Sequence, residues 1–101
     1  MILVRNVFKV KFGKSKDAVN AWKEMLALSK RLGLPSKSNR ILTDLVGDFY
    51  TVVFEHTFES LAEFESGAKG MMSNSEWQTA YARIIEITES GYREIFNIAA
   101  E

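Results

Sequence analysis

The sequence contains no cysteine, only one proline and no excess of either charge. Without cysteine there can be no disulfide framework, no thiolate nucleophile and no zinc site that uses cysteine ligands. Because 13 basic and 13 acidic side chains cancel, no long-range field draws the chain towards nucleic acid or an anionic membrane. The apolar run before Arg5 is too short for a signal peptide or a membrane span. We therefore expect a cytoplasmic protein with neither a membrane nor a nucleic-acid partner.

A chain of 101 residues fits one domain, 1–101, that buries about 65% of its unfolded surface. Within it, Ile41–Phe58 predicts a β-hairpin, because Gly47 and Asp48 stand between two runs rich in β-branched and aromatic residues. A two-residue turn there fixes the cross-strand pairs, which include Val46/Phe49, Leu42/Val53, Ile41/Phe54, Arg40/Glu55 and Asn39/His56.

Before the hairpin, alternating residues predict a strand over Ile2–Phe12. A helix follows, with Ser15 as its N-cap and Gly33 directly after its end. Three-and-four spacing predicts that its inner stripe comprises Ala18, Val19, Trp22, Met25, Leu26, Ser29 and Leu32.

After the hairpin, Ser60 and Glu63 have the spacing of a capping box that opens a second helix. Two glycines weaken this helix, so we expect a break near Ser73-Asn74 and a new start in a capping box over Ser73–Glu76. The longer part would end at Gly91, before a short last strand over 92–98. Inward positions would be Leu61, Phe64, Ala68, Met71, Met72, Trp77, Ala80, Tyr81, Ile84, Ile85 and Thr88.

This order of elements predicts an α+β, ferredoxin-like βαββαβ fold. Right-handed crossovers give one antiparallel sheet of order 4-1-3-2 with the helices on one face. Centring the first and third strands on each other pairs Phe8 with Phe54 and Asn6 with His56 on the helix side. A slip of two residues would put Phe54 beside Asn6 and leave the faces unchanged.

The helix-free face is expected to combine matched charges with a thin apolar band. Its predicted rows are Arg5/Glu55/Arg40, Val7/Val53/Leu42 and Lys9/Thr51/Asp44. In a monomer the apolar side chains would be open to water, although burying each is worth about 1.5–3 kcal/mol. We therefore expect an isologous homodimer in which two sheets pack face to face. Its dimer face would contain Arg5, Val7, Arg40, Leu42, Phe49, Val53 and Glu55; the ion row could alternatively bind an anion.

Several short motifs resemble the dimeric α/β-barrel superfamily, and within it NIPSNAP-type proteins most of all. They read V-R-N-V-F on the first strand, S-L-A-E-F from Ser60, S-E-W from Ser75 and R-E-I-F from Arg93. The resemblance spans nearly the whole chain and implies a dimeric barrel. This superfamily includes cofactor-independent antibiotic-biosynthesis monooxygenases, haem-degrading oxygenases and chlorite-dismutase-like proteins. The haem degraders have an asparagine like Asn6, but their axial histidine and distorting tryptophan correspond to Phe64 and Tyr81.

The only polar cluster predicted on the helix side of the sheet consists of Asn6, His56 and Asn39. Buried polar groups without partners cost about 1–3 kcal/mol each, so these three must bond to one another, to water or to a ligand. In a ligand site, His56 would accept a proton or donate a hydrogen bond, and Asn6 would be a second catalytic candidate. Asn39 would lie beside them, at the end of an apolar cavity lined by Phe8, Phe54, Trp22, Trp77 and Tyr81. Amphipathic packing alone also explains these aromatic residues.

Other chemistries have weaker signals. His56 and Glu59 have the spacing of a metal pair but lack a third ligand, so we assign no metal and no cofactor. RNA-recognition domains share this topology, yet they carry aromatic residues where the central strands here have Val7, Lys9, Thr51 and Val53.

Three functions remain. The first is a NIPSNAP-like homodimer, of unassigned reaction, that binds a small apolar or aromatic molecule between sheet and helices. The second is a cofactor-independent monooxygenase or isomerase acting on a small aromatic substrate, and the third is a purely structural dimer. The first two require an open cavity ending at His56, whereas the third predicts that Trp22, Trp77 and Met72 fill this space.

Overall fold

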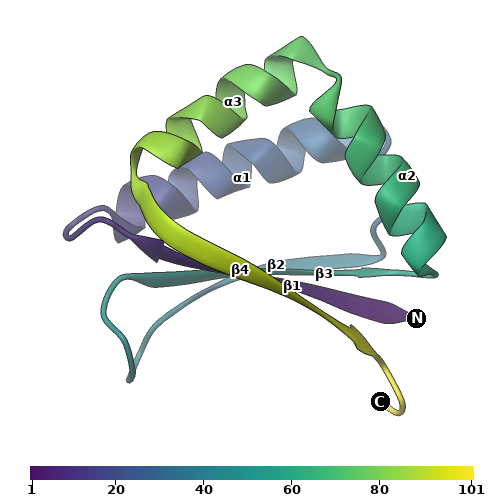
Figure 1. The fold of residues 1–101 in the computed structure, drawn as a ribbon, viewed down its shortest axis with the longest axis horizontal. Helices are drawn as coiled ribbons and strands as arrows, with labels where there is room; N and C mark the ends of the chain where they lie inside the picture. The colour runs from purple at the N-terminus through teal and green to yellow at the C-terminus, as the bar shows by residue number, and fades with distance from the viewer.

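The computed structural model describes residues 1–101 and contains four strands and three helices. The strands form one antiparallel sheet of order β2-β3-β1-β4, and all three helices cover the same face of it (Figure 1). This is the predicted ferredoxin-like α+β fold, with the strand order read from the other edge. The elements are β1 (Ile2–Val10), α1 (Ser15–Arg31), β2 (Ser38–Thr43), β3 (Thr51–Phe58), α2 (Leu61–Met72), α3 (Ser75–Glu86) and β4 (Thr88–Asn97).

The register of the β2–β3 hairpin is the predicted one, with Leu42 opposite Val53 and Asn39 opposite His56. The tight turn at Gly47 and Asp48 is wrong, because residues 44–50 form a longer loop instead. The Asp44 carboxylate closes this loop by accepting a hydrogen bond from the Thr51 amide at 3.0 Å. The loop extends to the side of the sheet away from the helices (Figure 1). At its tip Leu45 and Val46 are each 95% exposed, so no side-chain packing there stabilises a longer hairpin.

The pairing of β1 with β3 differs from the centred prediction by two residues. Asn6 lies opposite Phe54, and His56 lies opposite Val4. The predicted row of three polar side chains is therefore wrong, since only His56 and Asn39 are direct partners. The observed register pairs every residue of β3 with β1, which the centred register does not. The faces are unchanged, and the predicted helix-free pairs Arg5/Glu55/Arg40 and Val7/Val53/Leu42 are confirmed.

Strand β4 starts earlier than the glycine signal predicted. Helix α3 ends at Glu86, and Gly91 lies inside the strand opposite Phe8. A Cβ atom at Gly91 would lie 2.7 Å from Cδ1 of Phe8 and 3.0 Å from the carbonyl oxygen of Val7. The glycine is therefore required by close packing across the strand pair and not by a helix end.

The ends of α1 are set in two different ways. The predicted N-cap at Ser15 is wrong, because the helix already includes this residue and Lys14 precedes it without a side-chain cap bond. At the other end Gly33 has a φ of 88°, which an L side chain rarely adopts. The amides of Gly33 and Leu34 donate to carbonyls of the last turn at 3.1 and 3.0 Å. This is the Schellman arrangement, and it confirms the predicted end.

The break between α2 and α3 is where it was predicted, but the cap is a different residue. The Glu63 amide donates to Ser60 Oγ at 3.2 Å, which confirms the predicted start of α2. At α3, Asn74 Oδ1 accepts from the Trp77 amide at 3.0 Å, so Asn74 and not Ser73 is the N-cap. Asparagine is among the strongest N-cap residues, and here it alone has the extended backbone that a cap requires.

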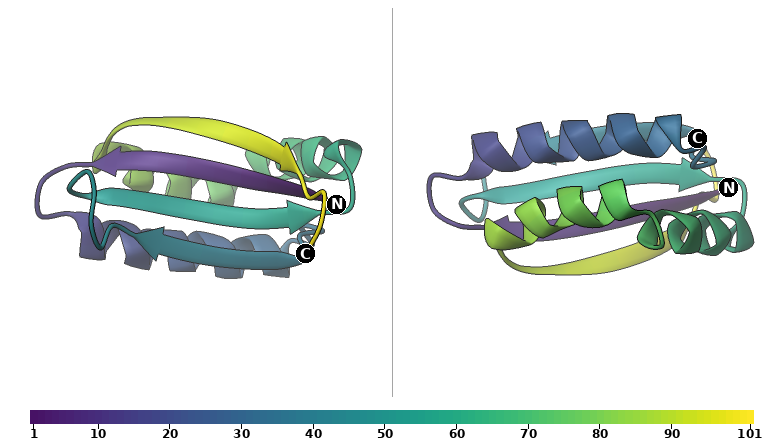
Figure 2. Two further views of the ribbon diagram at one scale, coloured as in Figure 1. Left: turned by 90° about the horizontal axis from the view of Figure 1, so that it is seen from below. Right: turned by 90° about the horizontal axis from the view of Figure 1, so that it is seen from above.

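The core has two parts, and α1 covers the β2 side of the sheet while α3 covers the β4 side (Figure 2). The predicted inward positions of α2 and α3 are wrong for Leu61, Met72, Tyr81 and Ile85, which are 47%, 60%, 36% and 57% exposed. None of the helices is long and apolar enough to span a bilayer. The larger cluster comprises Val10, Ala18, Trp22, Met25, Val52, Phe54 and Ile84, and the smaller one, beneath α2, comprises Ile2, Val4, Phe58 and Phe64.

Candidate functional site

His56 is buried among aromatic rings on the helix side of β3. The centroids of Phe54 and Phe58 lie 4.8 Å from its ring, and that of Phe64 on α2 lies 6.0 Å away, all in edge-to-face geometry. Neither Nδ1 nor Nε2 has a hydrogen-bond partner. Burial, together with the positive charge of Arg93, lowers the pKa of His56 to about 4. The imidazole is therefore neutral at pH 7, with one free donor and one free acceptor.

Other buried polar atoms on the surrounding elements also lack partners. They are Trp22 Nε1 on α1, Asn39 Oδ1 on β2 and Glu63 Oε2 on α2. Asn39 is the cross-strand partner of His56, and its Nδ2 donates to Ser36 Oγ at 3.0 Å. Because buried polar groups are nearly always hydrogen-bonded, such a set calls for water or a ligand.

Asn6 takes part in a different interaction from the one predicted. Its Oδ1 accepts a hydrogen bond from Arg93 Nε at 2.7 Å, and its Nδ2 donates to the carbonyl oxygen of Phe54 at 3.3 Å. The guanidinium of Arg93 in turn lies over the ring of Phe64, 5.2 Å from its centroid. The amide of Asn6 is thus occupied by the protein itself, and Asn6 acts here by holding Arg93 beneath α2.

Arg93 is the site residue that the sequence reasoning missed. Alternation along β4 places it on the helix side of the sheet, opposite Asn6. The alternation was visible in the sequence, but the last strand was predicted to start only at Tyr92, and its residues were not assigned to either face of the sheet. With its true extent, every second residue from Gly91 to Asn97 faces the helices.

The aromatic residues predicted to line a cavity form two stacks. Trp22 lies between Phe8 and Phe54, with ring centroids 5.0 and 5.2 Å apart and nearly parallel planes. Trp77 stacks on Tyr81 at 4.9 Å, both on α3. The space between Phe8 and Phe54 is thus occupied by Trp22. Nowhere do three His, Asp or Glu side chains come together as a metal site requires.

An ion row crosses all four strands on the helix-free face. Glu55 accepts from Arg40 Nε at 2.7 Å, and its other oxygen lies 3.3 Å from Arg5 Nε. Arg5 Nη1 also donates to Glu94 at 2.9 Å. Glu55 is only 6% exposed even though no element covers this face. The predicted ion pairs therefore form within one chain, and β4 extends them by Glu94.

Apolar side chains flank this ion row on both sides. Tyr92 lies in one row with Val7, and Phe96 lies in one row with Leu3. These two aromatic residues are 59% and 49% exposed and were not among the predicted dimer-face residues. Phe49, which was, lies on the loop, where its carbonyl accepts from Lys9 Nζ at 2.8 Å.

Fold and site together define a ferredoxin-like α+β domain with a buried histidine–phenylalanine cluster and a bare sheet face. Solved NIPSNAP proteins share this fold, and so, with lower similarity, do antibiotic biosynthesis monooxygenases. No protein-family model matches the chain, and no curated protein matches it in sequence.

Three solved structures illustrate the likeness. An uncharacterized NIPSNAP domain protein from Burkholderia xenovorans superposes with a TM-score of 0.86 at 16% identity, over 99% of this chain and 96% of that one. A NIPSNAP family protein from Agrobacterium tumefaciens superposes with a TM-score of 0.82 at 15% identity, over 95% of this chain and 90% of that one. A mutant of SnoaB, a cofactor-independent oxygenase from Streptomyces nogalater, superposes with a TM-score of 0.76 at 10% identity, over 99% of this chain and 94% of that one. At these identities the likeness is one of fold.

Proposed function

We propose that the protein is a homodimer that binds a small apolar or aromatic molecule, carrying a hydrogen-bonding group, between the sheet and α2. The observation that carries this proposal is His56, a buried neutral imidazole with both nitrogens unpaired. A phenol, enol or carbonyl group of a ligand would pair with one of these nitrogens. The surrounding rings of Phe58 and Phe64 would bury the apolar part of the same molecule.

Access to His56 requires movement of α2, and its construction favours such movement. Phe64 is the side chain of this helix that lies against both His56 and Phe58. Gly70 is exposed and has no atom within 4 Å of where its Cβ would be, so no other element packs against α2 at this position. The helix ends at Met72 with Ser73 as its C-cap, and rotation there would lift Phe64 from the histidine.

Two probes that differ by one hydroxyl group test the role of His56. We expect 2-naphthol to bind the native protein about tenfold more tightly than naphthalene, because only the former bonds to His56. His56→Leu should remove this difference, whereas Lys69→Ala on the exposed side of α2 should preserve it. Calorimetric titration measures both ratios. If naphthol binds the His56→Leu variant as tightly as the native protein, the proposed site is wrong; if neither probe binds, the purely structural dimer is favoured.

The dimer is proposed from the helix-free face. Figure 2 (left) shows the four strands side by side on this face with no helix over them. On this face rows of apolar side chains lie on either side of the ion row, which contains both positive and negative charges. Two copies related by a twofold axis can therefore place the positive groups of one copy opposite the negative groups of the other. Packing two sheets face to face would cover Leu42, Tyr92 and Phe96.

Sedimentation equilibrium at micromolar concentration tests the dimer. We expect twice the chain mass of 11.5 kDa for the native protein. The double substitution Tyr92→Ser and Phe96→Ser should shift the mass to that of one chain, because it removes two exposed aromatic groups from the face. Ile85→Ser, which removes an equally exposed side chain from α3, should leave the dimer intact. A native protein of 11.5 kDa alone would refute the dimer.

A second candidate function is a cofactor-independent monooxygenase or isomerase, favoured by the fold shared with SnoaB. His56 would then accept the proton of a phenolic substrate, whose phenolate could react with dioxygen. With its pKa at about 4, His56 is a weak base. Against a phenol of pKa about 10 the transfer costs about 8 kcal/mol, so hydrogen bonding is the better supported role. Oxygen uptake with dihydroxynaphthalene tests this: equal rates for native protein and His56→Ala would remove His56 from the reaction.

A further inference from the structure

Arg93 is the only arginine of the chain without a carboxylate partner. Each of the other four arginines has a glutamate oxygen within 3.8 Å. The Nε atom of Arg93 donates to Asn6, whereas its two terminal nitrogens, Nη1 and Nη2, bond to no group of the protein. These two nitrogens form a planar fork whose geometry matches a carboxylate or a phosphate.

The protein holds this free guanidinium in one place. Asn6, which is only 6% exposed, uses its carbonyl oxygen to accept from Arg93 and its amino group to bond to the backbone of β3. The ring of Phe64 lies against the guanidinium on another side. Because β4 is an edge strand, Arg93 is also open to solvent. A charge that is already oriented loses little side-chain freedom when it pairs with an anion.

Arg93 and His56 share the ring of Phe64, which lies 5.2 Å from the guanidinium carbon and 6.0 Å from the imidazole centroid. The sheet between them is apolar, since Val4 is the cross-strand partner of both His56 and Ile95. Ile95 is 42% exposed on the helix side of the edge strand. Two strand spacings, or about 10 Å, separate β3 from β4, which is close to the length of two fused aromatic rings with one polar substituent.

We propose that the ligand of the site at His56 is a small aromatic carboxylate whose anionic group pairs with Nη1 and Nη2 of Arg93. This inference rests on the function proposed above and names the class of ligand. When α2 moves, the aromatic ring of the ligand would take the place of Phe64 above Val4. It would then contact the imidazole and the guanidinium as Phe64 does in the closed protein.

The charge around the site favours a carboxylate over a dianionic phosphate. Arg93 is the only charged group that acts on the pKa of His56, which it lowers together with burial. One negative charge therefore balances the site, whereas the second charge of a phosphate would be left without a partner. A neutral ligand would leave the fork of Arg93 unpaired and would also remove the ring of Phe64 from it.

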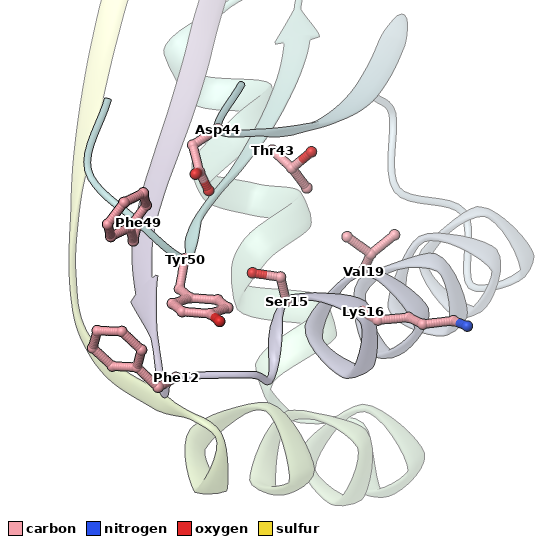
Figure 3. Close-up of a pocket in the computed structure, with 8 residues that line it drawn as sticks. All are labelled: Phe12, Ser15, Lys16, Val19, Thr43, Asp44, Phe49 and Tyr50. Atoms are coloured by element: carbon pink, nitrogen blue, oxygen red, sulfur yellow. The ribbon is translucent and has the colours of Figure 1, made fainter. Parts of the chain in front are cut away.

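The open pocket at the other end of the sheet does not suit an aromatic acid. It lies where β1 ends and β3 begins, and aromatic rings line one side of it (Figure 3). The carboxylate of Asp44 points towards Tyr50 in this pocket, whereas the ammonium group of Lys16 points away (Figure 3). An anion that entered there would meet a negative charge, so we expect an aromatic acid to bind at Arg93 instead.

Two probes of nearly the same shape test the proposal on the native protein. 2-Naphthoate carries the negative charge, and 2-naphthamide lacks it. Calorimetric titration should show that 2-naphthoate binds about tenfold more tightly. The guanidinium ¹⁵N signals of Arg93 should shift with 2-naphthoate, and the backbone amide signal of Tyr50 should not. Equal affinities overturn this inference alone if 2-naphthol still binds through His56; if no probe binds, the function proposed above fails with it.

Variants with matched controls locate the charge that is recognised. Arg93→Gln should abolish the preference for 2-naphthoate, and Arg93→Lys, which keeps the charge but not the fork, should reduce it to about threefold. Arg83→Gln, on the exposed side of α3, should preserve the tenfold preference. His56→Leu should weaken both probes and leave their ratio unchanged. A full preference in either Arg93 variant, or its loss in Arg83→Gln, would overturn the proposal.

Discussion

Replacing His56 by leucine should make the unliganded protein more stable, and increasingly so as the pH falls. In the folded state the pKa of His56 is about 4, whereas the ordinary value is 6.5. Between these values the unfolded chain binds a proton that the folded chain does not bind. The free energy of unfolding of the native protein therefore decreases as the pH falls from about 6.5 to about 4. Leucine cannot bind a proton and removes this dependence.

The size of the effect follows from the gap between the two pKa values. At 1.36 kcal/mol per pH unit, the native protein loses about 3 kcal/mol relative to the leucine variant between pH 7 and pH 4. At pH 7 the free energy of unfolding of the leucine variant should already be about 1 kcal/mol higher than that of the native protein, since the variant no longer buries two unpaired nitrogens. The apolar leucine suits the ring cluster formed by Phe54, Phe58 and Phe64.

Urea unfolding from pH 4 to pH 7, followed by tryptophan fluorescence, measures the difference between the two proteins. Carboxylates titrate in both, so the difference isolates His56, which is the only histidine of the chain. The ring-proton NMR signal should give the same pKa directly. A stability difference that stays constant over this range, or a ring that titrates near 6.5, would refute the reasoning.

Two further predictions concern the helix ends and the glycines. Gly70→Ala should stabilise the protein by about 1 kcal/mol, since it meets no atom within 4 Å. Gly67→Ala should give no such gain in stability, because its Cβ would lie 2.7 Å from Leu34 Cδ1. Thermal unfolding of the two variants compares their stabilities. Equal gains would show that α2 does not pack against Leu34. Asn74→Ala should cost about 1 kcal/mol through loss of the α3 cap, and Ser73→Ala much less. Chemical unfolding of both variants tests this, and the reverse order would contradict the assigned cap.

The faces of the sheet could be predicted from the sequence because the side-chain period of a strand is a local property. Alternation along Ile2–Phe12 and through the hairpin assigned Phe8 and Phe54 to the helix side and Val7 and Val53 to the bare side, as the structure shows. The strand order followed from the handedness of the crossovers.

The candidate site could be predicted only in part. His56 was recognised because it is the one histidine on an apolar face, and its partner Asn39 followed from the hairpin register. The pairing of Asn6 with Arg93 was missed, since it joins residues far apart in the sequence across β1 and β4. Alternation along β4 assigns Arg93 to the helix side, but only the register of β4 against β1 brings it opposite Asn6.

Local chemistry in the sequence thus determined the order of elements, the two faces of the sheet and three of the helix ends. Tertiary packing alone decided the rest. Registers that differ by two residues keep every side chain on its face, so only the full pairing of β3 with β1 selects between them. Gly91 has the signature of a helix end, but the ring of Phe8 requires it inside a strand. A glycine is needed wherever atoms come too close for a side chain, and which atoms come close is known only once the chain has folded.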